Sequence, residues 1–436
     1  MGIVSFKDKR KFENAVLRLE QRSATPNPDA HKIATRILKE VRRGGDTALD
    51  HICRKLGELD NTRRESLGIR PKQFRIPTAT LQSALEQVTP EFRDAVLFAA
   101  NNIRQFAEWQ KPQPFLRNIL PGVQVGQLIK PLASVGCYVP GGRYPLPSTM
   151  LMTVIPAQVA GVPRIVVCSP KPVLETLATA ALLGVSEFYA IGGAQAIAAL
   201  AYGTKQIDPV LKIVGPGNSY VTAAKQLVSA AGACSIDMLA GPTEALIASD
   251  DPNADPAMLA SDLVSQAEHD TETSCVFVTS LPRLAKALEQ EATRRTKQNP
   301  LAQSSLKRNG HIFLTANAQH TLEIATRIAS EHTTVDSLSA AENLSSAGSL
   351  FIGNHSAQAF GDYVSGPNHT LPTGALARQR GGLSVLDFLK IVTVQQISRE
   401  GAQTLTPAAL ALARAEGLIG HAASITARQI GASTHA

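Results

Sequence analysis

A carboxylate and an imidazole are adjacent in the sequence at Glu331 and His332. When such a pair is partly shielded from water, it can take up and release protons near neutral pH, as general acid and base catalysis requires. The pair follows a helical pattern from Ala318 to Ser330, so we expect it at the end of a helix. Taken alone, the dipeptide specifies no reaction.

A second pair of polar residues has a spacing that suits a metal ion. Gln266 and His269 are three residues apart in SQAEHD, which follows the helical run PAMLASDLV. On one face of a helix, this spacing would let both side chains reach the same ion. A single histidine on a helix is more often structural, and Glu268 is expected to be a solvent-exposed residue.

Two further segments carry polar groups that need partners. Asp362 lies in a turn-rich loop, where it could be an oxygen ligand or could cap a helix. Glu416 and His421 are five residues apart in an otherwise apolar tail, where a metal ion or a neighbouring subunit would have to satisfy them. A mixed nitrogen and oxygen zinc shell would consist of Gln266, His269, Asp362 and His421. Spacing alone does not show that these four residues meet.

Glycine-rich loops offer candidate sites for a cofactor. GGAQ, ending at Gln195, and GPGN, ending at Asn218, each follow a predicted strand and open a helix, and neither matches GxGxxG. Their amides could bind a ligand, or the loops could be ordinary turns with helix-capping amides. Tyr138 opens a third loop, which ends at Gly142, and its ring could stack on a flat ligand or simply pack against the protein.

The elements that would position these loops are short β-branched runs, each followed by small residues and a helical pattern. Because alternating strands and helices require parallel crossovers, we predict a doubly wound parallel sheet, followed by a second α/β region. We expect helices over 29–110, 282–295 and 318–330 and in the last fifty or so residues, from about Ser384. The expected strands are ASVGCYVPGG, RIVVCSP, EFYAIGG and LKIVGPGN in the first region and SCVFVTS, HIFLT and SLFIGN in the second.

Composition and charge restrict the class of protein. The 436 residues suggest two to three domains, and 44% hydrophobic with 18% charged residues is typical of a globular α/β protein. The net charge of +7 is dispersed, and the basic clusters lack interleaved aromatic residues, which argues against a nucleic-acid partner. Five cysteines without a CxxC pair favour a reduced, cytoplasmic chain. No signal peptide or long apolar run is present, so we expect a soluble protein without a membrane partner.

Ten ordered segments also resemble a known family. They are YVPGG, PSTMLM, PAQVAGV, GGAQAIAALAYGT, VGPGN, IDMLAGPTE, SDLVSQAEH, GDYVSGPNHTLPTG, GLSVLDFLK and EGLIGHAASI. From about Lys32 to Arg428 the chain is similar to the histidinol dehydrogenases. Any one segment would be weak, but ten in order at the family's spacing are specific.

The resemblance implies roles for individual residues. Tyr138, Gln195 and Asn218 would bind NAD. The proton chemistry would fall to Glu331 and His332. One zinc ion per subunit would be held by Gln266, His269, Asp362 and His421. The substrate would contact the four zinc ligands, His332 and three further residues, Ser148, Thr243 and Glu416.

The resemblance also implies a reaction and an assembly. The reaction would be the zinc-dependent, four-electron oxidation of L-histidinol through L-histidinaldehyde to L-histidine with two NAD, the last step of histidine biosynthesis. The assembly would be a homodimer that exchanges C-terminal helical tails and shares its active sites. The fold would be α/β, with two Rossmann-like, incomplete doubly wound domains. We expect an N-terminal helical segment (1–32), a discontinuous first α/β domain (33–136 and 244–383), a second, NAD-binding α/β domain (137–243) and the tail (384–436).

Departures from the family pattern leave alternatives open. Ser330 and Thr333 flank the dyad where the family commonly has Pro and Leu, and Thr243 replaces a frequent Ser. The segment RYPLPSTM also lacks the aromatic residue that the family often has two residues before Ser148. The chain could be a related dehydrogenase of another polar alcohol, such as a sulfonated propanediol. Cys137 could act as an aldehyde-trapping nucleophile. The scaffold could also serve a non-enzymatic nucleotide- or nucleic-acid-binding protein.

Overall fold

The computed structural model describes residues 1–23, 28–141 and 144–430, which form two compact units. The first unit contains Met1–Gln110 and Ala133–Phe388, and the second contains Lys111–Leu132 and Leu389–Ala436. Gly142, at the end of the loop that Tyr138 opens, lies outside the described residues, as do residues 24–27 of the expected N-terminal segment and 431–436 of the tail. Among the described helices, none has the length and apolar character needed to cross a bilayer.

The first unit contains a six-stranded sheet in which every pair of neighbouring strands is parallel. Its order is β1-β11-β10-β9-β12-β13, so β9 and β12 lie side by side inside the sheet. The strands are β1 (Gly2–Ser5), β11 (Gly310–Leu314), β10 (Ser274–Thr279), β9 (Glu244–Ala248), β12 (His332–Val335) and β13 (Ser349–Ile352).

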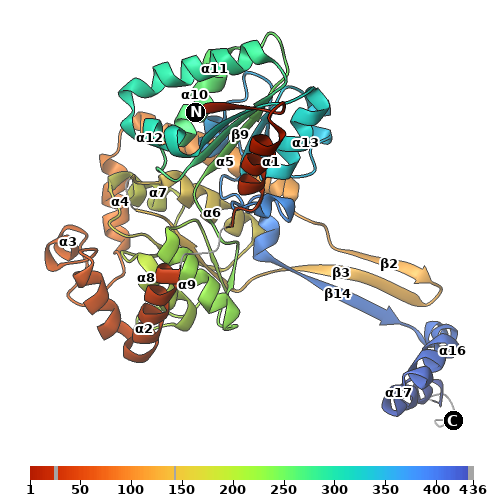
Figure 1. Cartoon of the computed structure of the whole chain (residues 1–436). Coiled ribbons are helices and arrows are strands. Elements are labelled where there is room, and N and C mark those ends of the chain that lie inside the picture. Colours follow the sequence, from red (N-terminus) through yellow and green to blue (C-terminus); the bar gives the residue numbers. More distant parts are fainter. Residues whose placement is uncertain (24–27, 142–143, 431–436) are drawn as a thin grey trace. The chain divides into compact units, whose positions relative to one another are not determined.

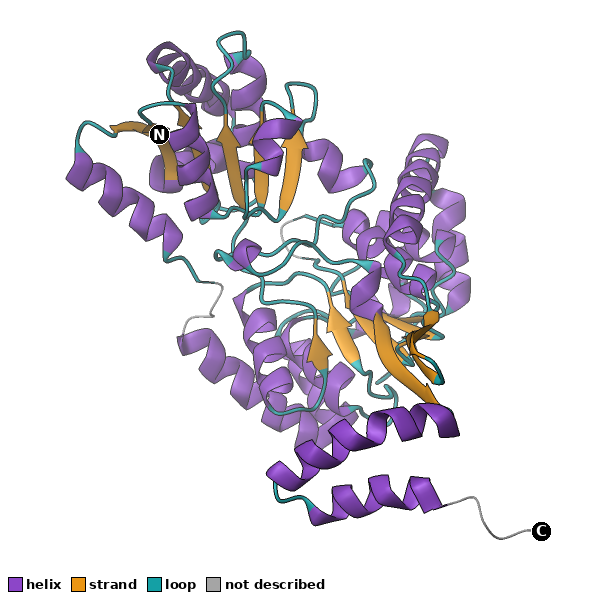
Figure 2. Ribbon diagram, turned by 90° about the vertical axis from the view of Figure 1, so that its right-hand side faces the viewer, coloured by secondary structure: helices purple, strands orange, loops and turns teal. Residues whose placement is uncertain are grey.

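Both faces of this sheet are apolar, because consecutive residues of a strand point to opposite sides and the interior strands β9 and β10 are apolar at successive positions. Ala245 and Ile247 of β9 belong to a core cluster with α10, α11 and α12, whereas Leu246 and Ala248 belong to a second cluster with α1 and α13. The sheet is therefore covered on both faces (Figure 2). The helices of this part are α1 (Lys9–Glu20), α10 (Pro256–Ala267), α11 (Pro282–Arg295), α12 (Pro300–Asn309), α13 (Ala318–Ile328), α14 (Leu338–Glu342) and α15 (Gln358–Tyr363), with short 3-10 helices at Thr296–Gln298, Leu376–Arg378 and Val385–Phe388.

A second parallel sheet of five strands, in the order β6-β5-β4-β7-β8, completes the first unit. Because β4 lies between β5 and β7, the topological switch point falls at β4 and β7. The strands are β4 (Ser134–Tyr138), β5 (Arg164–Cys168), β6 (Glu187–Tyr189), β7 (Lys212–Val214) and β8 (Ser235–Ile236). The helices that follow these strands are α6 (Pro147–Ala160), α7 (Leu174–Leu182), α8 (Gly193–Tyr202) and α9 (Ser219–Ala230), and the N-terminal helices are α2 (Pro28–Lys55), α3 (Asn61–Ser66), α4 (Thr78–Gln87) and α5 (Pro90–Gln110).

The second unit is an antiparallel ribbon followed by two helices (Figure 1). The ribbon consists of β2 (Phe115–Leu120), β3 (Val123–Pro131) and β14 (Leu389–Ile397), and the helices are α16 (Arg399–Ala415) and α17 (Ile419–Ile430). Within α16 only Gly401, Thr406 and Ala413 are buried among the described residues, and Ile419 is 85% exposed. As predicted, the helical tail has little core of its own.

The predicted α/β class and the two parallel sheets are confirmed, and α11 has the bounds that the sequence indicates. Two expectations need correction. The N-terminal segment begins with strand β1, which is too short to show a period-2 pattern, and the tail begins with strand β14 before its helices. In β14 a β-branched run, LKIVTVQQI, pairs along its whole length with β3, so pairing rather than burial forms this strand.

The position of the early helices also differs from expectation. The sequence predicts that 33–136 share a domain with 244–383, but α2 packs on α8 and α9, α4 on α7, and α5 on α6. Helices α6 to α9 all follow strands of the five-stranded sheet. The apolar stripes of α2, α4 and α5 therefore cover the predicted cofactor half rather than the six-stranded sheet.

Candidate active site

Glu331 and His332 lie where the chain enters the interior of the six-stranded sheet. Helix α13 ends at Ile328, Ala329 adopts a left-handed conformation with φ 53°, and His332 is the first residue of β12. The expected position at a helix end is thus wrong for His332, because the polar strand HTTV is buried between β9 and β13 and lacks a hydrophobic pattern. Glu331 is 7% exposed and His332 is 3% exposed.

The surroundings of this pair favour proton exchange. His332 Nδ1 is 3.8 Å from Glu331 Oε2, and His332 Nε2 is 3.2 Å from Asp362 Oδ1. Burial raises the pKa of Glu331 well above its usual range. Burial alone would lower the pKa of His332, but the carboxylates of Glu331 and Asp362 outweigh it and raise that pKa. A carboxyl group and an imidazole, both with raised pKa values, are therefore available to gain and lose a proton.

Two of the four predicted metal ligands are in direct contact. Gln266 Nε2 donates a hydrogen bond to Asp362 Oδ2 at 2.8 Å, and Gln266 Oε1 is buried without a partner among the described residues. Asp362 lies inside α15 and does not cap it. Burial would raise the pKa of Asp362, but His332, His369 and the hydrogen bond from Gln266 outweigh it and lower that pKa. The side chain is therefore an ionised oxygen donor.

His269 and His421, the other two predicted metal ligands, do not take part in the contact between Gln266 and Asp362. Helix α10 ends at Ala267, so His269 lies beyond the helix rather than on its face, and its N–H donates to Gln266 O at 3.2 Å. Glu268 is exposed, as expected, and accepts a hydrogen bond from Asn299. His421 lies in α17 of the second unit, where it is exposed. Within the described ranges, no three side chains of His, Cys, Asp or Glu are grouped so that they could hold a metal. Gln266 would have to contribute its amide oxygen.

Two residues of the site were not identified as candidates from the sequence. His369 Nδ1 is 2.7 Å from Asp362 O, and its Nε2 is 3.2 Å from Thr149 Oγ1. Glu244 is 4% exposed, receives two hydrogen-bonding or ionic contacts from Arg22, and donates its own N–H to Glu331 Oε2 at 3.0 Å. The only available signals were a histidine in a turn-rich loop and a glutamate that opens an apolar strand, EALIA.

The three further residues that the resemblance assigns to the substrate, Ser148, Thr243 and Glu416, lie in different parts of the chain. Ser148, in the first turn of α6, lines a cavity of about 630 Å³ together with His269 and Tyr363. Thr243 directly precedes β9 and is partly buried. Glu416 is the C-cap of α16 in the second unit and is exposed. The first unit therefore brings Ser148 and His269 to one cavity.

Two of the predicted cofactor residues meet at the N-terminus of α8. Gly193 N–H donates to Tyr138 Oη at 3.1 Å, and Gln195 Nε2 donates to Glu58 Oε2 at 2.8 Å. Tyr138 is 3% exposed and Gln195 is 0% exposed, so the ring of Tyr138 packs inside the protein. Within the described chain, Gln195 Oε1 has no hydrogen-bond partner. This buried amide oxygen is an unused acceptor beside a helix N-terminus.

Asn218 has the capping role that was the alternative interpretation of its loop. Its Oδ1 accepts hydrogen bonds from Tyr220 N and Val221 N, both at 3.1 Å, and caps α9. The preceding Gly215 has φ 111°, and a Cβ atom there would lie 2.1 Å from Tyr138 O. The loops after β4 and β7 therefore touch at the switch point, and only glycine permits this approach.

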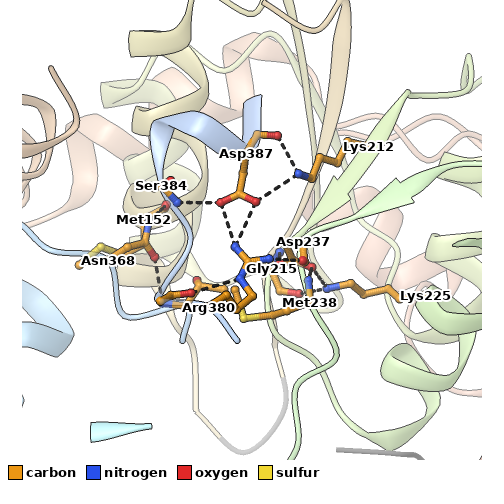
Figure 3. Close-up of polar contacts among 12 residues, drawn as sticks. Met152, Lys212, Gly215, Lys225, Asp237, Met238, Asn368, Arg380, Ser384 and Asp387 are labelled. Carbon is orange, nitrogen blue, oxygen red and sulfur yellow. Dashed lines mark hydrogen bonds and ion pairs between the residues drawn. The ribbon is translucent and has the colours of Figure 1, made fainter. Parts of the chain in front are cut away.

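A buried ion pair fixes Gly215 (Figure 3). Asp237 Oδ2 accepts a hydrogen bond from Gly215 N at 2.8 Å, and Lys225 Nζ donates to Gly215 O at 2.9 Å. Lys225 and Asp237 also pair directly with each other, and both side chains are at most 3% exposed. One ion pair thus holds both backbone polar groups of the glycine that approaches Tyr138.

The same network continues into the segment that follows Asp362. Arg380 donates to Asp237 O and forms two contacts of 3.1 Å with the carboxylate of Asp387 (Figure 3). Asp387 also accepts hydrogen bonds from Lys212 of β7. The loop at Gly215 and the chain from 366 to 388 are therefore held by shared charges.

Cys137 does not have the properties of a nucleophile. It lies within β4, it is 0% exposed, and burial raises the pKa of its thiol to about 12. A protonated, enclosed thiol cannot attack an aldehyde. This alternative is therefore wrong.

The fold and the site together fit an α/β enzyme that uses acid–base chemistry: a doubly wound parallel sheet with glycine-opened helices and a buried carboxylate and imidazole pair. A family model described as histidinol dehydrogenase matches residues 20–429. The chain belongs to this family and is an NAD-dependent dehydrogenase, as the resemblance predicts. The alternative of a non-enzymatic binding protein is therefore wrong.

Individual relatives cover nearly the whole chain. A histidinol dehydrogenase of Aquifex aeolicus is 41% identical over 97% of this chain and 98% of its own length. One of Thermus thermophilus is 41% identical over 96% of this chain and 99% of its own. The crystal structure of histidinol dehydrogenase from Elizabethkingia anophelis superposes with a TM-score of 0.90 at 31% identity, covering 98% of both chains.

The ion pair at Gly215 predicts a selective effect on the cofactor. In Lys225→Met, Asp237 is left buried without its cation, which we expect to destabilise the fold by about 3–5 kcal/mol and to release Gly215. The KM for NAD should then rise several-fold more than the KM for the alcohol. Lys205→Met, a change at an exposed lysine, is the matched control. Steady-state kinetics and thermal unfolding are measured for both variants. Equal changes in both KM values would show that the pair only stabilises the fold.

Proposed function

We propose that this protein oxidises L-histidinol through L-histidinaldehyde to L-histidine, using two NAD and one zinc ion per subunit, as the last step of histidine biosynthesis in the cytoplasm. The observation that carries the proposal is the buried Glu331–His332 pair, whose imidazole faces Asp362 3.2 Å away. Membership of the histidinol dehydrogenase family supports this substrate.

The residues of the site fit a zinc ion. Gln266 Oε1 is buried and has no partner in the described chain, and the neighbouring carboxylate of Asp362 is ionised. An amide oxygen, a carboxylate and imidazoles form a donor set that zinc accepts. The proposed ligands are Gln266, His269, Asp362 and His421. When bound, the ion would hold the imidazole and amine of the substrate and so orient its alcohol.

His332 is the proposed base of the first oxidation. Its Nδ1 is buried and has no hydrogen-bond partner within the described ranges, so this nitrogen can accept a proton once the ring is neutral. It takes the hydroxyl proton of the alcohol while the carbinol carbon loses a hydride to NAD. The products of this step are the aldehyde, NADH and a proton held by the enzyme.

Glu331 is the proposed base of the second oxidation, acting with His332 on a water molecule. Its Oε2 is fixed by the N–H of Glu244, and its raised pKa suits a group that gains and loses a proton near neutral pH. Removal of a proton from water allows oxygen to add to the aldehyde. The resulting hydrate loses a second hydride to a second NAD and becomes the carboxylic acid.

The cofactor and the remaining substrate groups have proposed places as well. Tyr138, Gln195 and Asn218 would bind NAD, and the unused Gln195 Oε1 is the polar atom that supports this role. Ser148, Thr243 and Glu416 would contact the substrate together with His332 and the four zinc ligands. Glu416 supplies a negative charge, which suits a cationic amino alcohol better than a sulfonated one.

The assembly is proposed to be a homodimer in which each tail completes the partner's site. Ile119 and Leu412 are each 65% exposed and Ile419 is 85% exposed, so the second unit presents apolar surface that an interface would cover. Glu416 and His421 would reach the site of the partner subunit through this exchange. Neither nucleic acid nor a membrane is a proposed partner.

The stoichiometry of the reaction tests the proposed substrate and metal together. We expect two NADH per L-histidinol consumed by zinc-restored protein, and none by metal-free protein. The measurement is NADH absorbance against chromatographic loss of substrate. A well-folded, zinc-loaded dimer that leaves L-histidinol untouched but oxidises another polar alcohol would be a related dehydrogenase.

The two oxidations can be separated with Glu331→Gln. Because this variant loses the proposed water-activating base but keeps His332, we expect about 10²–10⁴-fold slower aldehyde oxidation and a much smaller effect on alcohol oxidation. Single-turnover assays started with L-histidinol and with L-histidinaldehyde measure the two steps. Undiminished aldehyde oxidation would remove Glu331 from the mechanism.

Tail exchange can be tested by mixing two inactive variants, His332→Asn and His421→Ala. If a site combines one body with the partner's tail, each mixed dimer regains one intact site of two. Random subunit exchange then restores roughly a quarter of wild-type activity. Unmixed samples of each variant are the controls. No recovery, although mixed dimers are detected by native mass spectrometry, would place each tail at its own site.

A further inference from the structure

Glu58 is a carboxylate that the fold brings to the predicted cofactor half from a distant part of the sequence. Helix α2 ends at Lys55, and Gly57 turns the chain with φ 61°. Glu58 Oε2 then accepts hydrogen bonds from Gly192 N at 3.3 Å and Gln195 Nε2 at 2.8 Å. Neither the family resemblance nor the spacing of motifs assigns a role to this residue.

The contacts around Glu58 decide what kind of ligand can bind there. The N–H groups of Gly192 and Gly193 at the start of α8 are already bonded to Glu58 and to Tyr138 Oη. Tyr138 and Gln195 are buried, whereas Glu58 and Gly193 are partly exposed. A ligand that approaches this end of the sheet therefore meets the carboxylate of Glu58, which already accepts the N–H of Gly192. Hydroxyl groups are attracted to such a site, and phosphate groups are repelled.

The position of the catalytic residues determines which end of a dinucleotide lies near Glu58. Asn368 Nδ2 donates to Met152 O at 2.6 Å and His369 contacts Thr149, so the loop that follows Asp362 packs on α6, directly after β4. Glu58 contacts α8, which follows β6, the edge strand of the sheet. Two strand spacings separate β4 from β6, or about 10 Å. With the nicotinamide near His332, the adenosine end extends toward Glu58.

We propose that Glu58 binds the 2′-hydroxyl of the adenosine ribose of NAD and rejects the 2′-phosphate of NADP, an inference that rests on the proposed placement of NAD over this sheet. A carboxylate accepts a hydrogen bond from a ribose hydroxyl, as acidic residues do in dinucleotide sites of doubly wound sheets. Because Glu58 is half-buried, solvent screens its charge only partly.

Lys171 carries a positive charge that acts on the carboxylate of Glu58. Burial raises the pKa of Glu58, and the charge of Lys171, which is exposed in the loop after β5, opposes that rise. With the carboxylate removed, this ammonium group is left to attract a 2′-phosphate. Discrimination between NAD and NADP therefore depends on the balance between Glu58 and Lys171.

The experiment measures Kd for NADH and NADPH by nicotinamide fluorescence on the full chain. In Glu58→Gln, which keeps the size and an acceptor oxygen, the ratio of the NADPH Kd to the NADH Kd should fall by at least about tenfold. In Glu58→Gln combined with Lys171→Ala, the gained NADPH affinity should be lost. Glu65→Gln, an exposed glutamate nearby in sequence, is the matched control and should leave the ratio unchanged.

An unchanged ratio in Glu58→Gln, or equal weakening of NADH and NADPH, would overturn the proposal, since a purely structural role affects both cofactors alike. Turnover of L-histidinol is assayed separately. Normal turnover with an unchanged ratio refutes only the role of Glu58. Failure to oxidise L-histidinol, with the ratio shifted as expected, refutes only the proposed substrate.

Discussion

The site depends on the cost of burying charge in the interior of a parallel sheet. His332 is the first residue of an interior strand and lies between two carboxylates, Glu331 and Asp362, at 3.8 and 3.2 Å. A buried ionised group is stable only when partners surround it, so each neighbour must be held in place. Arg22 and Gly374 contact the side chain of Glu244, whose N–H donates to Glu331. On the other side, Gln266 donates a hydrogen bond to Asp362, and His369 contacts the carbonyl oxygen of Asp362. The loops of this half are thus organised around one imidazole.

Buried charges in the predicted cofactor half also need partners, and there the pair is Lys225 and Asp237. Lys225 and Asp237 are paired in the interior and use their remaining hydrogen-bonding capacity on Gly215. Since glycine has no side chain, its position can be fixed only through its backbone. Arg380 extends this network to Asp387, so the segment that holds Gly215 is itself tied to residues more than a hundred positions away. The switch point is therefore fixed by a local ion pair, and Arg380 ties that pair to the segment around Asp387.

Local patterns made much of the fold predictable, and contacts distant in sequence explain most of the remainder. The run RIVVC, with turn residues after it, predicted β5, and the 3.6-residue pattern after Pro282 predicted α11. The strand HTTV gave no such signal because its polar residues are buried by neighbours that the sequence does not reveal. Likewise Gln266 and Asp362 could be proposed as ligands from residue type and resemblance, but their contact comes from tertiary structure. Glu58 and Glu244 had no local signal that separates them from surface glutamates.

Strand β1 has a consequence for the order in which the two sheets can form. Its only strand partner in the described sheet is β11, so Gly2–Ser5 must wait for residues about three hundred positions later in the chain. The five-stranded sheet uses only residues from Ser134 to Ile236 and can close earlier during synthesis. Pairing between distant segments is slow because loop closure costs entropy before contacts reward it. The nascent chain would therefore complete its predicted cofactor half while the sheet that holds Glu331 and His332 is still open, and the unpaired strands of that sheet, β1 among them, are exposed to aggregation until β11 emerges.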